Sequence, residues 1–277
     1  MPEGPEVKKT VDGLRCAIEN REIYSLAVMS GRYSKKDFPG FEDLVSVYPR
    51  LVTGVGCKGK FIYFLFGDGS SLWNTLGMTG HWSQEARKHS RIRIFIKEDG
   101  QEELRGDTLY YNDMRNFGTL KYVKTHKELE KKLESLGPDV LSDPPSVEEF
   151  KKCLLKGRRA EKTIAENIMN QSVVSGIGNY LKAEVLYDCR ISPHRVCSDL
   201  SDLEIEHILR SCVRITNLSY NLGGATIKNY RDVSGTNGVY TRRFAVYNQK
   251  SDPLGNEIVR EVTSDKRTTH WVPALQL

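Results

Sequence analysis

The stretch Met1-Pro2-Glu3-Gly4-Pro5-Glu6 opens the chain and leads directly into a helical pattern. Pro5 suits the first turn of a helix. Apolar residues then recur at helical spacing, at Val7, Val11, Leu14 and Ile18. We therefore expect an amphipathic helix over residues 5–19. Because its apolar stripe must pack on a core, this helix would hold the first residues of the chain in place.

The chemistry of this stretch depends on the nitrogen of Pro2. Removal of Met1 would give Pro2 a free secondary amine, which can attack a carbonyl carbon and form an iminium with a fixed positive charge. Glu3 places a carboxylate beside that nitrogen for proton transfer, and Glu6 lies one helical turn further on. The alternative is an arbitrary start whose glutamates form an acidic first turn, which the helix dipole favours.

Composition indicates a globular protein without a membrane span. The 277 residues are 39% hydrophobic and 28% charged, a length near which a single core divides into two domains. The net charge of +5 permits a nucleic-acid partner without establishing one. No apolar run approaches the roughly 20 residues of a membrane helix, and charged residues after Val7 argue against a signal peptide.

The cysteines indicate reduced thiols, not a metal site. None of the six forms a Cys-x-x-Cys pair or lies near histidines at ligand spacing. A four-ligand zinc site is therefore not expected. Scattered cysteines without a secretory signal are typical of an intracellular protein.

Strand signals dominate the region after the first helix. Strands are predicted over residues 23–29, 51–55, 60–66, 71–76, 91–96, 108–112 and 119–124. Turn sequences at 67–70 and 98–101 connect some of them. Many strands with short turns, behind one helix, predict a β-sandwich of antiparallel sheets.

The second half of the chain changes to helices. A charged helix over 126–136 ends at Gly137-Pro138, and Asp143-Pro144-Pro145 cannot be helical. The predicted division is a first domain over 1–138, a linker over 139–145, a helical domain over 146–238 and a strand-containing segment over 239–277. Helices are expected at 146–155, 163–170, 180–187 and 201–221, with capping boxes opening the first and the last. The final strands are expected at 241–247, 257–262 and 270–272.

Four other features suit contact with an anionic ligand, and each has a simpler alternative. Gly176-Ile177-Gly178-Asn179 has two glycines that permit close backbone approach, and Asn179 would cap a helix whose N-terminus suits a phosphate, with Lys162 and Lys182 nearby. The alternative is an ordinary turn between core helices. Lys60 either faces a pocket or extends to solvent from the end of its strand. Arg267 fits phosphate contact or a solvated turn. Loop residues Met78, Arg115 and Phe117 are either core plugs or wedges for a base stack.

Together these motifs resemble the Fpg/Nei family, the formamidopyrimidine-DNA glycosylases and endonuclease VIII-type DNA glycosylases. The resemblance runs the whole length in the family order, at residues 2–6, 59–60, 76–80, 112–118, 176–180 and 267–271. It implies an α+β protein, with a two-sheet antiparallel β-sandwich and an N-terminal helix, then a helix–two-turn–helix domain with a β-hairpin finger. It also implies a bifunctional DNA glycosylase/AP lyase of base excision repair.

The resemblance also implies roles for individual residues. Pro2 attacks C1′ of the damaged nucleotide, Glu3 is the acid/base for sugar opening, Glu6 supports the same pocket, and Lys60 contacts phosphate and assists catalysis. The other implied roles are void filling by Met78, Arg115 and Phe117, DNA contact by Asn179, Arg267, Lys162 and His89, and a lesion loop over 226–238 that includes Tyr230 and Arg231.

The finger departs from the family pattern. Most members carry four zinc cysteines there, whereas residues 239–277 contain none. No metal or other cofactor is therefore expected, and the hairpin must be held by packing of Val246, Ile258, Val262, Trp271 and Leu275. This departure is similar to the zincless-finger subgroup of endonuclease VIII-like enzymes, which implies oxidised pyrimidines and hydantoins as substrates.

The expected partner is double-stranded DNA with an oxidised base or an abasic site, with single-stranded or bubble DNA left open. We expect a monomer that resides wherever the genome does, in the nucleus or in the cytoplasm and nucleoid. Three alternatives remain: a preference for 8-oxoguanine or formamidopyrimidine within the same family, a catalytically silent damaged-DNA-binding protein, and an RNA-associated helix–two-turn–helix module.

Overall fold

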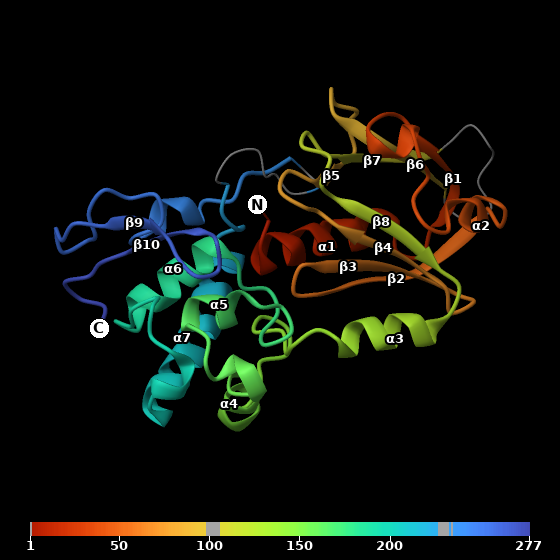
Figure 1. Ribbon diagram of the computed structural model, residues 1–277. Coiled ribbons are helices and arrows are strands. Elements are labelled where there is room, and N and C mark those ends of the chain that lie inside the picture. Colours follow the sequence, from red (N-terminus) through yellow and green to blue (C-terminus); the bar gives the residue numbers. More distant parts are fainter. Residues whose placement is uncertain (1, 98–105, 227–232, 234) are drawn as a thin grey trace. The chain divides into compact units, whose positions relative to one another are not determined.

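The computed structural model describes residues 2–97, 106–226, 233 and 235–277 (Figure 1). The chain forms two compact units. The N-terminal unit consists of Met1–Pro2, Glu6–Glu134 and Gly223–Gly238, and the C-terminal unit of Glu3–Pro5, Ser135–Leu222 and Val239–Leu277. The chain thus passes between the units several times, and the domain limits expected from the sequence stay a prediction.

The first helix anchors the start of the chain. Helix α1 spans Gly4–Ile18, and its apolar residues from Val7 onward lie in the core of the N-terminal unit. Leu14 and Ile18 are fully buried there. Arg15 adds a polar anchor, because its Nε donates a hydrogen bond to the carbonyl oxygen of Val55 at 2.6 Å. The predicted amphipathic helix is therefore present, and its apolar stripe is its packing face.

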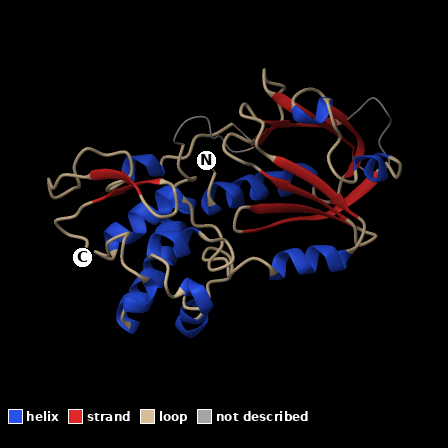
Figure 2. Ribbon diagram, viewed as in Figure 1, coloured by secondary structure: helices blue, strands red, loops and turns tan. Residues whose placement is uncertain are grey.

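The structure describes eight antiparallel strands in the N-terminal unit, red in Figure 2, in the order β5-β7-β6-β1-β2-β3-β4-β8. The first sheet contains β1 (Glu22–Val28), β5 (His81–Ser83), β6 (Ser90–Lys97) and β7 (Asp107–Asn112). The second contains β2 (Arg50–Lys58), β3 (Phe61–Phe66), β4 (Ser71–Thr75) and β8 (Thr119–Val123). Only two residue pairs join β1 to β2, so the strands fold at this corner into a sandwich.

Alternation along the strands decides which side chains enter this sandwich. On β6, Ile92 and Ile94 are fully buried, whereas Arg93 between them is exposed. The buried Trp82 ring lies 5.7 Å from the Phe64 ring and 5.2 Å from the Tyr111 ring, measured between centroids. Such aromatic contacts add to the free energy gained by burying apolar area. The predicted antiparallel sandwich is confirmed.

The remaining helical elements are short, apart from one long helix. In the N-terminal unit they are η1 (Arg32–Ser34), α2 (Phe41–Val45) and α3 (His126–Glu134). In the C-terminal unit they are α4 (Val147–Leu154), η2 (Gly157–Arg159), α5 (Ile164–Met169), α6 (Asn179–Asp188), η3 (Cys197–Asp199), α7 (Asp202–Asn221) and η4 (Tyr240–Arg243). Both predicted capping boxes are present, at Ser146 with Glu149 and at Ser201 with Glu204. No described helix is long and apolar enough to cross a membrane.

The finger contains one hairpin, formed by β9 (Val259–Val262) and β10 (Thr268–Trp271). The strand predicted over 241–247 is wrong, because η4 and a turn occupy those positions. The carboxylate of Glu184 accepts hydrogen bonds from the backbone N–H groups of Ala245, Val246 and Tyr247. Those donors are therefore bonded to a side chain and not to a neighbouring strand.

Packing inside the finger agrees with the sequence expectation at most positions. Val246, Ile258 and Val272 form a buried cluster with Ala183 of α6, and Leu275 packs against it. The expectation for Val262 is wrong, since this side chain is 70% exposed. Trp271 packs its ring edge to face against His194, with centroids 5.3 Å apart, outside the cluster.

Candidate active site

The N-terminus of α6 holds the carboxylate of Glu3. Glu3 is 2% exposed, and its Oε1 accepts a hydrogen bond from the backbone N–H of Tyr180 at 3.0 Å. Its Oε2 accepts one from Leu181 at 3.3 Å. These donors belong to the first helical turn, where backbone N–H groups lack helical partners and the dipole favours an anion. Because Pro2 directly precedes Glu3, fixing Glu3 restricts the Pro2 nitrogen.

The glycines of the 176–178 turn make room for the chain's own N-terminus. A Cβ on Gly178 would lie 2.2 Å from Cδ of Glu3, so no larger residue fits at this position without a shift. Gly4 donates its N–H to the carbonyl of Gly176 at 2.9 Å. The expectation that this turn leaves N–H groups free for a phosphate is therefore wrong for Tyr180 and Leu181. Asn179 is not the N-cap either, because Gly178 is.

Glu6 supports the segment that follows α7. It is 1% exposed, and its Oε1 accepts the backbone N–H of Ala225 at 2.6 Å. Gly224 has φ of +85°, and a Cβ there would lie 2.7 Å from the same oxygen. Glu6 thus fixes the start of the expected lesion loop, whose residues Tyr230 and Arg231 lie outside the described residues.

Lys60 lies in the turn before β3, and not within that strand as expected. The half-buried residue follows Gly59, whose φ of +57° makes the turn tight. Its neighbour Lys58 donates from Nζ to the carbonyl of Leu133 in α3 at 3.0 Å. The turn between β2 and β3 that contains Lys60 is therefore anchored to α3 through Lys58.

Two loops of the N-terminal unit are joined through a buried carboxylate. Asp113 is 1% exposed and accepts hydrogen bonds from the Thr79 hydroxyl and from the Gly118 N–H. Arg115 donates its own N–H to the Thr79 hydroxyl at 2.9 Å. The loop after β4, with Met78, and the loop after β7, with Arg115, therefore form one structure. Sequence reasoning missed Asp113 and Thr79, although an aspartate in a turn was a signal for side-chain-to-backbone bonding.

The tips of these loops carry apolar and cationic side chains. Phe117 is 54% exposed and Met114 is 47% exposed, so neither is a core plug. The Arg115 guanidinium carbon lies 5.1 Å from the centroid of the Phe117 ring. Met78 is half-buried. Met114 was not singled out from the sequence, and its exposure beside Arg115 adds it to this group.

Asn179 and Arg267 lie close together in the C-terminal unit, as the sequence prediction requires. The Asn179 side-chain amide donates to the carbonyl of Thr268, the residue after Arg267, at 2.9 Å. Arg267 donates its backbone N–H to Asp265 at 3.2 Å, and its side chain is exposed. The start of α6 and the finger turn are therefore held together.

Lys182 stabilises this junction from inside. Its side chain is fully buried, and its Nζ lies 2.5 Å from Oδ2 of Asp265 and 2.7 Å from Oγ1 of Thr269. Burial lowers the pKa of Lys182, while the carboxylate of Asp265 acts in the opposite direction. Lys182 is therefore a structural ion-pair partner, and the expectation that it offers its charge to an anionic ligand is wrong.

Lys162 and His89 lie in less specialised surroundings. The exposed Lys162 ammonium, just before α5, lies 3.2 Å from Oε1 of Glu166 in the first turn of that helix. His89 is half-buried, and its carbonyl accepts the N–H of Asp113 at 3.0 Å. His89 is thus connected to the loop that carries Arg115.

Within the described residues, one group has metal-ligand geometry, namely Asp188, Cys189 and His207, with ligand atoms within 4.8 Å of one another. Burial raises the pKa of the Cys189 thiol to about 12, whereas metal ligation needs the thiolate. Asp188 is already bound by the Ser211 hydroxyl and the Arg214 guanidinium. These residues do not fit a metal site.

Three domains of one protein family together match nearly the whole chain. The formamidopyrimidine-DNA glycosylase N-terminal domain matches residues 1–120, its H2TH domain residues 136–231, and its C-terminal domain residues 237–277. The chain is 30% identical to the formamidopyrimidine-DNA glycosylase of Prochlorococcus marinus, over 100% of both proteins. It is 28% identical to that of Ligilactobacillus salivarius, over 100% of this chain and 99% of the relative.

Solved structures agree with this relationship. The MutM (Fpg) protein of Thermus thermophilus superposes with a TM-score of 0.85 at 27% identity, covering 99% of this chain and 98% of that one. A Lactococcus lactis Fpg mutant bound to DNA containing Fapy-dG gives 0.85 at 26% identity, covering 99% of each chain. The protein belongs to the formamidopyrimidine-DNA glycosylase family, a family of DNA-repair enzymes. The predictions of the family, the enzyme class and the α+β fold are confirmed.

Proposed function

We propose that this protein is a bifunctional DNA glycosylase and AP lyase of base excision repair, with the Pro2 amine as nucleophile after removal of Met1. The observation that carries the proposal is the buried Glu3 carboxylate, held by the N–H groups of Tyr180 and Leu181. This carboxylate lies next to Pro2 in the chain and is bonded so that it cannot rotate freely. This arrangement supports a nucleophile at Pro2 that acts with a proton-transfer group at Glu3.

Double-stranded DNA with a damaged base or an abasic site is the proposed substrate. The Lactococcus lactis relatives were solved with DNA containing Fapy-dG and with DNA containing an AP site, which supports this choice. The net charge of +5 is consistent with a polyanionic partner. Because its substrate is the genome, the protein would act wherever the genome resides.

The proposed reaction begins when the Pro2 nitrogen attacks C1′ and the bond from C1′ to the base breaks. The base leaves with a proton, and Glu3 handles the proton at the sugar oxygen as the ring opens. The resulting iminium acidifies the C2′ proton. Loss of that proton expels the 3′ phosphate, and a second elimination expels the 5′ phosphate. The iminium serves as the electron sink for both eliminations. Water then hydrolyses it, which releases the sugar fragment, restores the Pro2 amine and leaves a one-nucleotide gap.

The remaining residues would bind and open the duplex. Extruding a damaged base costs less than extruding a well-stacked one, by about a few kcal/mol. Met78, Arg115 and Phe117 would occupy the vacated space, and the exposure of Phe117 supports this role. Phosphate contacts are assigned to Lys60, Asn179 and Arg267, with Lys162 and His89 at the margin. In this proposal residues 1–138 contribute the nucleophile, the wedge loops after β4 and β7, and the phosphate contacts at Lys60 and His89. Residues 146–277 contribute the phosphate contacts at Asn179, Arg267 and Lys162.

We further place the protein in the endonuclease VIII-like branch with a zincless finger, acting chiefly on oxidised pyrimidines and hydantoins. The support is the absence of cysteine from residues 239–277 and the apolar cluster of Val246, Ile258 and Val272 inside the finger. The names of the relatives favour the second candidate, a preference for formamidopyrimidine or 8-oxoguanine.

Borohydride trapping tests the chemistry. Incubation of the protein with an abasic-site duplex and borohydride should give a covalent adduct, and Pro2→Gly and Glu3→Gln should reduce it strongly. A preparation that retains Met1 is the matched control, because it has the same side chains but an unreactive amide at Pro2. An adduct that survives both substitutions, or no adduct at all, would reject the enzyme proposal and favour a catalytically silent DNA-binding protein.

A cleavage panel tests the branch. Duplexes with thymine glycol, 5-hydroxyuracil, a hydantoin or 8-oxoguanine opposite cytosine would be compared at equal enzyme concentration. The endonuclease VIII-like assignment requires faster cleavage of the first three. Strong preference for 8-oxoguanine, or one tightly bound zinc per chain by metal analysis, would reverse it.

A further inference from the structure

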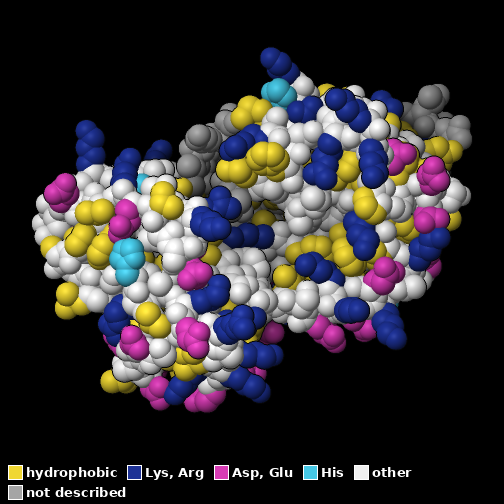
Figure 3. All heavy atoms as spheres, in the orientation of Figure 1, with side chains coloured by type: hydrophobic (Ala, Val, Ile, Leu, Met, Phe, Trp, Pro, Cys, Tyr) yellow, Lys and Arg dark blue, Asp and Glu magenta, His cyan; other side chains and the backbone are white. Residues whose placement is uncertain are grey.

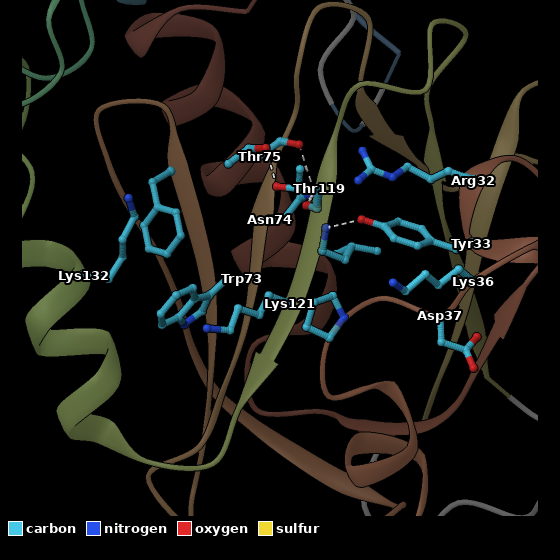
Figure 4. Close-up of a pocket in the computed structure, with 13 residues that line it drawn as sticks. Arg32, Tyr33, Lys36, Asp37, Trp73, Asn74, Thr75, Thr119, Lys121 and Lys132 are labelled. Atoms are coloured by element: carbon cyan, nitrogen blue, oxygen red, sulfur yellow. Dashed lines mark hydrogen bonds between the residues drawn. The ribbon is translucent and has the colours of Figure 1, made fainter.

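A groove of about 630 Å³ lies on the outer face of the second sheet of the N-terminal unit (Figure 4). Trp73 and Thr75 of β4 line the groove. Leu72, the residue before Trp73 on the same strand, belongs instead to the sandwich core. The full lining is Arg32, Tyr33, Lys36, Asp37, Pro39, Phe61, Trp73, Asn74, Thr75, Thr119, Leu120, Lys121 and Lys132. None of these residues belongs to the proposed catalytic or phosphate-contact set, so a ligand in this groove would bind at a separate site.

The charge of the groove favours an anionic occupant. Its lining has four cations, which are Arg32, Lys36, Lys121 and Lys132, and one carboxylate, which is Asp37. On the visible face of the β-rich unit in Figure 3, Lys and Arg side chains are interspersed with hydrophobic ones. A surface that mixes cations with apolar groups suits a ligand that is itself both charged and flat.

Aromatic rings lie directly beside these cations. The rings of Phe61 and Trp73 meet edge to face with centroids 5.3 Å apart. The ammonium of Lys121 lies 5.0 Å from the Trp73 centroid, and that of Lys132 lies 5.4 Å from the Phe61 centroid. Figure 4 shows the two lysines approaching from different elements, Lys132 from α3 and Lys121 from β8. Each ammonium thus lies over a ring face. A phosphate that binds the Lys121 ammonium would draw it away from Trp73 and leave that face open for a base.

Sheet register fixes the spacing of these groups. Trp73 pairs with Lys121 across β4 and β8, and Thr75 pairs with Thr119. The two threonine hydroxyls are hydrogen-bonded at 2.6 Å. Because a sheet holds cross-strand neighbours at constant spacing, the ring and the ammonium are arranged before any ligand arrives.

The groove is continuous with the loops that bear the proposed wedge residues. The loop containing Met78 follows Thr75, and Phe117 precedes Thr119 by two residues. Arg32 joins the two regions, since its guanidinium donates to the carbonyl of Gly118 at 3.4 Å. A nucleic-acid strand that passes the wedge loops would therefore meet this end of the groove.

We propose that the groove binds single-stranded DNA next to the wedge loops, with phosphates at Arg32, Lys121 and Lys132 and a base at Trp73. The direction from which the strand arrives rests on the proposed function. The groove has the volume of a small-ligand pocket, which suits a short stretch of one strand and not a duplex. A nucleic acid suits this groove better than an acidic peptide does. Its bases would contact the aromatic rings, and its strand would continue to the wedge loops.

Fluorescence anisotropy with labelled oligo(dT) tests the proposal. Charge reversal in the double variant Lys121→Glu/Lys132→Glu should weaken binding about tenfold at low salt, because two phosphate contacts are lost. The slope of log K against log salt should fall by about 1.4, at roughly 0.7 for each phosphate contact on a single strand. Arg93→Glu is the control for each single variant, Lys121→Glu and Lys132→Glu, since it makes the same change of charge at an exposed cation on the outer face of the other sheet. An equal loss of oligo(dT) binding in Arg93→Glu, or no loss in the double variant, would overturn the proposal that DNA binds in the groove.

Tryptophan fluorescence tests the base contact separately. Oligo(dT) should quench the tryptophan fluorescence of the protein. Trp73→Phe should abolish most of that quenching while retaining binding, since Trp82 is fully buried. The half-buried Trp271 is the third tryptophan, and Trp271→Phe should leave most of the quenching in place. Quenching unchanged in Trp73→Phe would overturn stacking at this ring. Polyglutamate that competes as well as oligo(dT) of equal charge would overturn the nucleic-acid assignment in favour of an acidic peptide.

The two proposals fail in different ways. Borohydride trapping on a short abasic duplex depends on Pro2 and should be the same in Lys121→Glu/Lys132→Glu as in the wild type. Lost oligo(dT) binding with normal trapping supports the groove as a separate site. Normal oligo(dT) binding by a wild-type protein that gives no trapped adduct would reject the enzyme proposal. The groove would then stand as a DNA-binding site with no role in base excision.

Discussion

The Tyr180 backbone N–H donates a 3.0 Å hydrogen bond to Oε1 of Glu3, across a separation of 177 positions in the chain. This bond joins the residue beside the proposed nucleophile to the first turn of α6. It explains why the Gly178 position allows no side chain, and it makes the start of the chain part of the C-terminal unit for residues Glu3–Pro5. The proposed chemistry therefore depends on a helix remote in sequence.

Glu3→Gln should abolish activity without unfolding the protein. The amide oxygen of glutamine can still accept the Tyr180 N–H, whereas its NH2 group would face the Leu181 N–H, so the unfolding free energy should fall by about 1–3 kcal/mol while the fold is kept. Base excision should fall by about 100-fold or more, because proton transfer by a positioned carboxylate contributes roughly that much. The control is Glu184→Gln, which alters another buried glutamate bonded to backbone N–H groups. Excision by that variant should be normal, and equal losses in both variants would contradict a catalytic role for Glu3.

Gly178→Ala should damage the same site through sterics alone. The new Cβ would lie 2.2 Å from Cδ of Glu3, so the carboxylate must move. We expect a loss of about 1–3 kcal/mol in unfolding free energy and a large drop in trapping yield. Gly67→Ala is the comparison, because its Cβ would meet nothing closer than Thr53 at 3.7 Å. If Gly178→Ala traps as well as Gly67→Ala, the close approach is not needed for function.

Lys182→Met should destabilise the junction between α6 and the finger turn. It would leave the Asp265 carboxylate buried without its ammonium partner, at a cost of about 3–5 kcal/mol. Lys151→Met removes an ion pair of the same length, with Asp202, from an exposed position and should cost less than about 1 kcal/mol. Urea unfolding measures both. Similar values for the two variants would show that the Lys182 pair is not structural.

Phe117→Ala should impair lesion processing while leaving stability nearly unchanged. The side chain is 54% exposed, so its removal should alter the unfolding free energy by less than about 0.5 kcal/mol. If Phe117 fills the space of the extruded nucleotide, kcat/KM should fall about tenfold or more. Leu203→Ala truncates another large apolar residue, 79% exposed on α7, and should have normal kcat/KM. A Phe117→Ala enzyme with wild-type kcat/KM would refute the wedge assignment.

The finger should lose stability in acid through Glu261. The hydrogen bond from His194, 2.7 Å away, lowers the pKa of the Glu261 carboxyl below its ordinary value of 4.5, while burial acts in the opposite direction. A lowered folded pKa gives stabilisation that is present above pH 4.5 and is lost as the pH falls through the folded value.

Thermal melts across this pH range check the effect. His194→Ala should show a smaller acid-side decrease in melting temperature than the wild type, because the largest cause of the lowered pKa is gone and only the hydrogen bond from Trp271 still lowers it. The exposed His126 lies 3.5 Å from Glu130 on α3, and His126→Ala should keep the wild-type pH profile. A His194→Ala profile that matches the wild type would show that this contact does not stabilise the finger.

The expectations that rest on local sequence patterns are the ones that the structure confirms. The apolar spacing of α1, the alternation on β6 and the capping boxes at Ser146 and Ser201 involve residues within a few positions of one another. The strand expected over 241–247 failed for the opposite reason. Glu184, about 60 residues earlier, takes the backbone N–H groups that a ladder would need. No pattern within that window reveals such a competitor.

The sequence by itself determined the order of the motifs, the helical and strand periodicities, and the absence of cysteine from the finger. Only the tertiary structure decided which donors bind Glu3, that Asp265 neutralises Lys182, and that Asp113 joins the two wedge loops. The physical reason is the range of the interactions. Periodicity reflects neighbours along the chain, whereas a buried carboxylate or ammonium must find its partner wherever packing brings one. Such partners are defined only once the whole chain has folded.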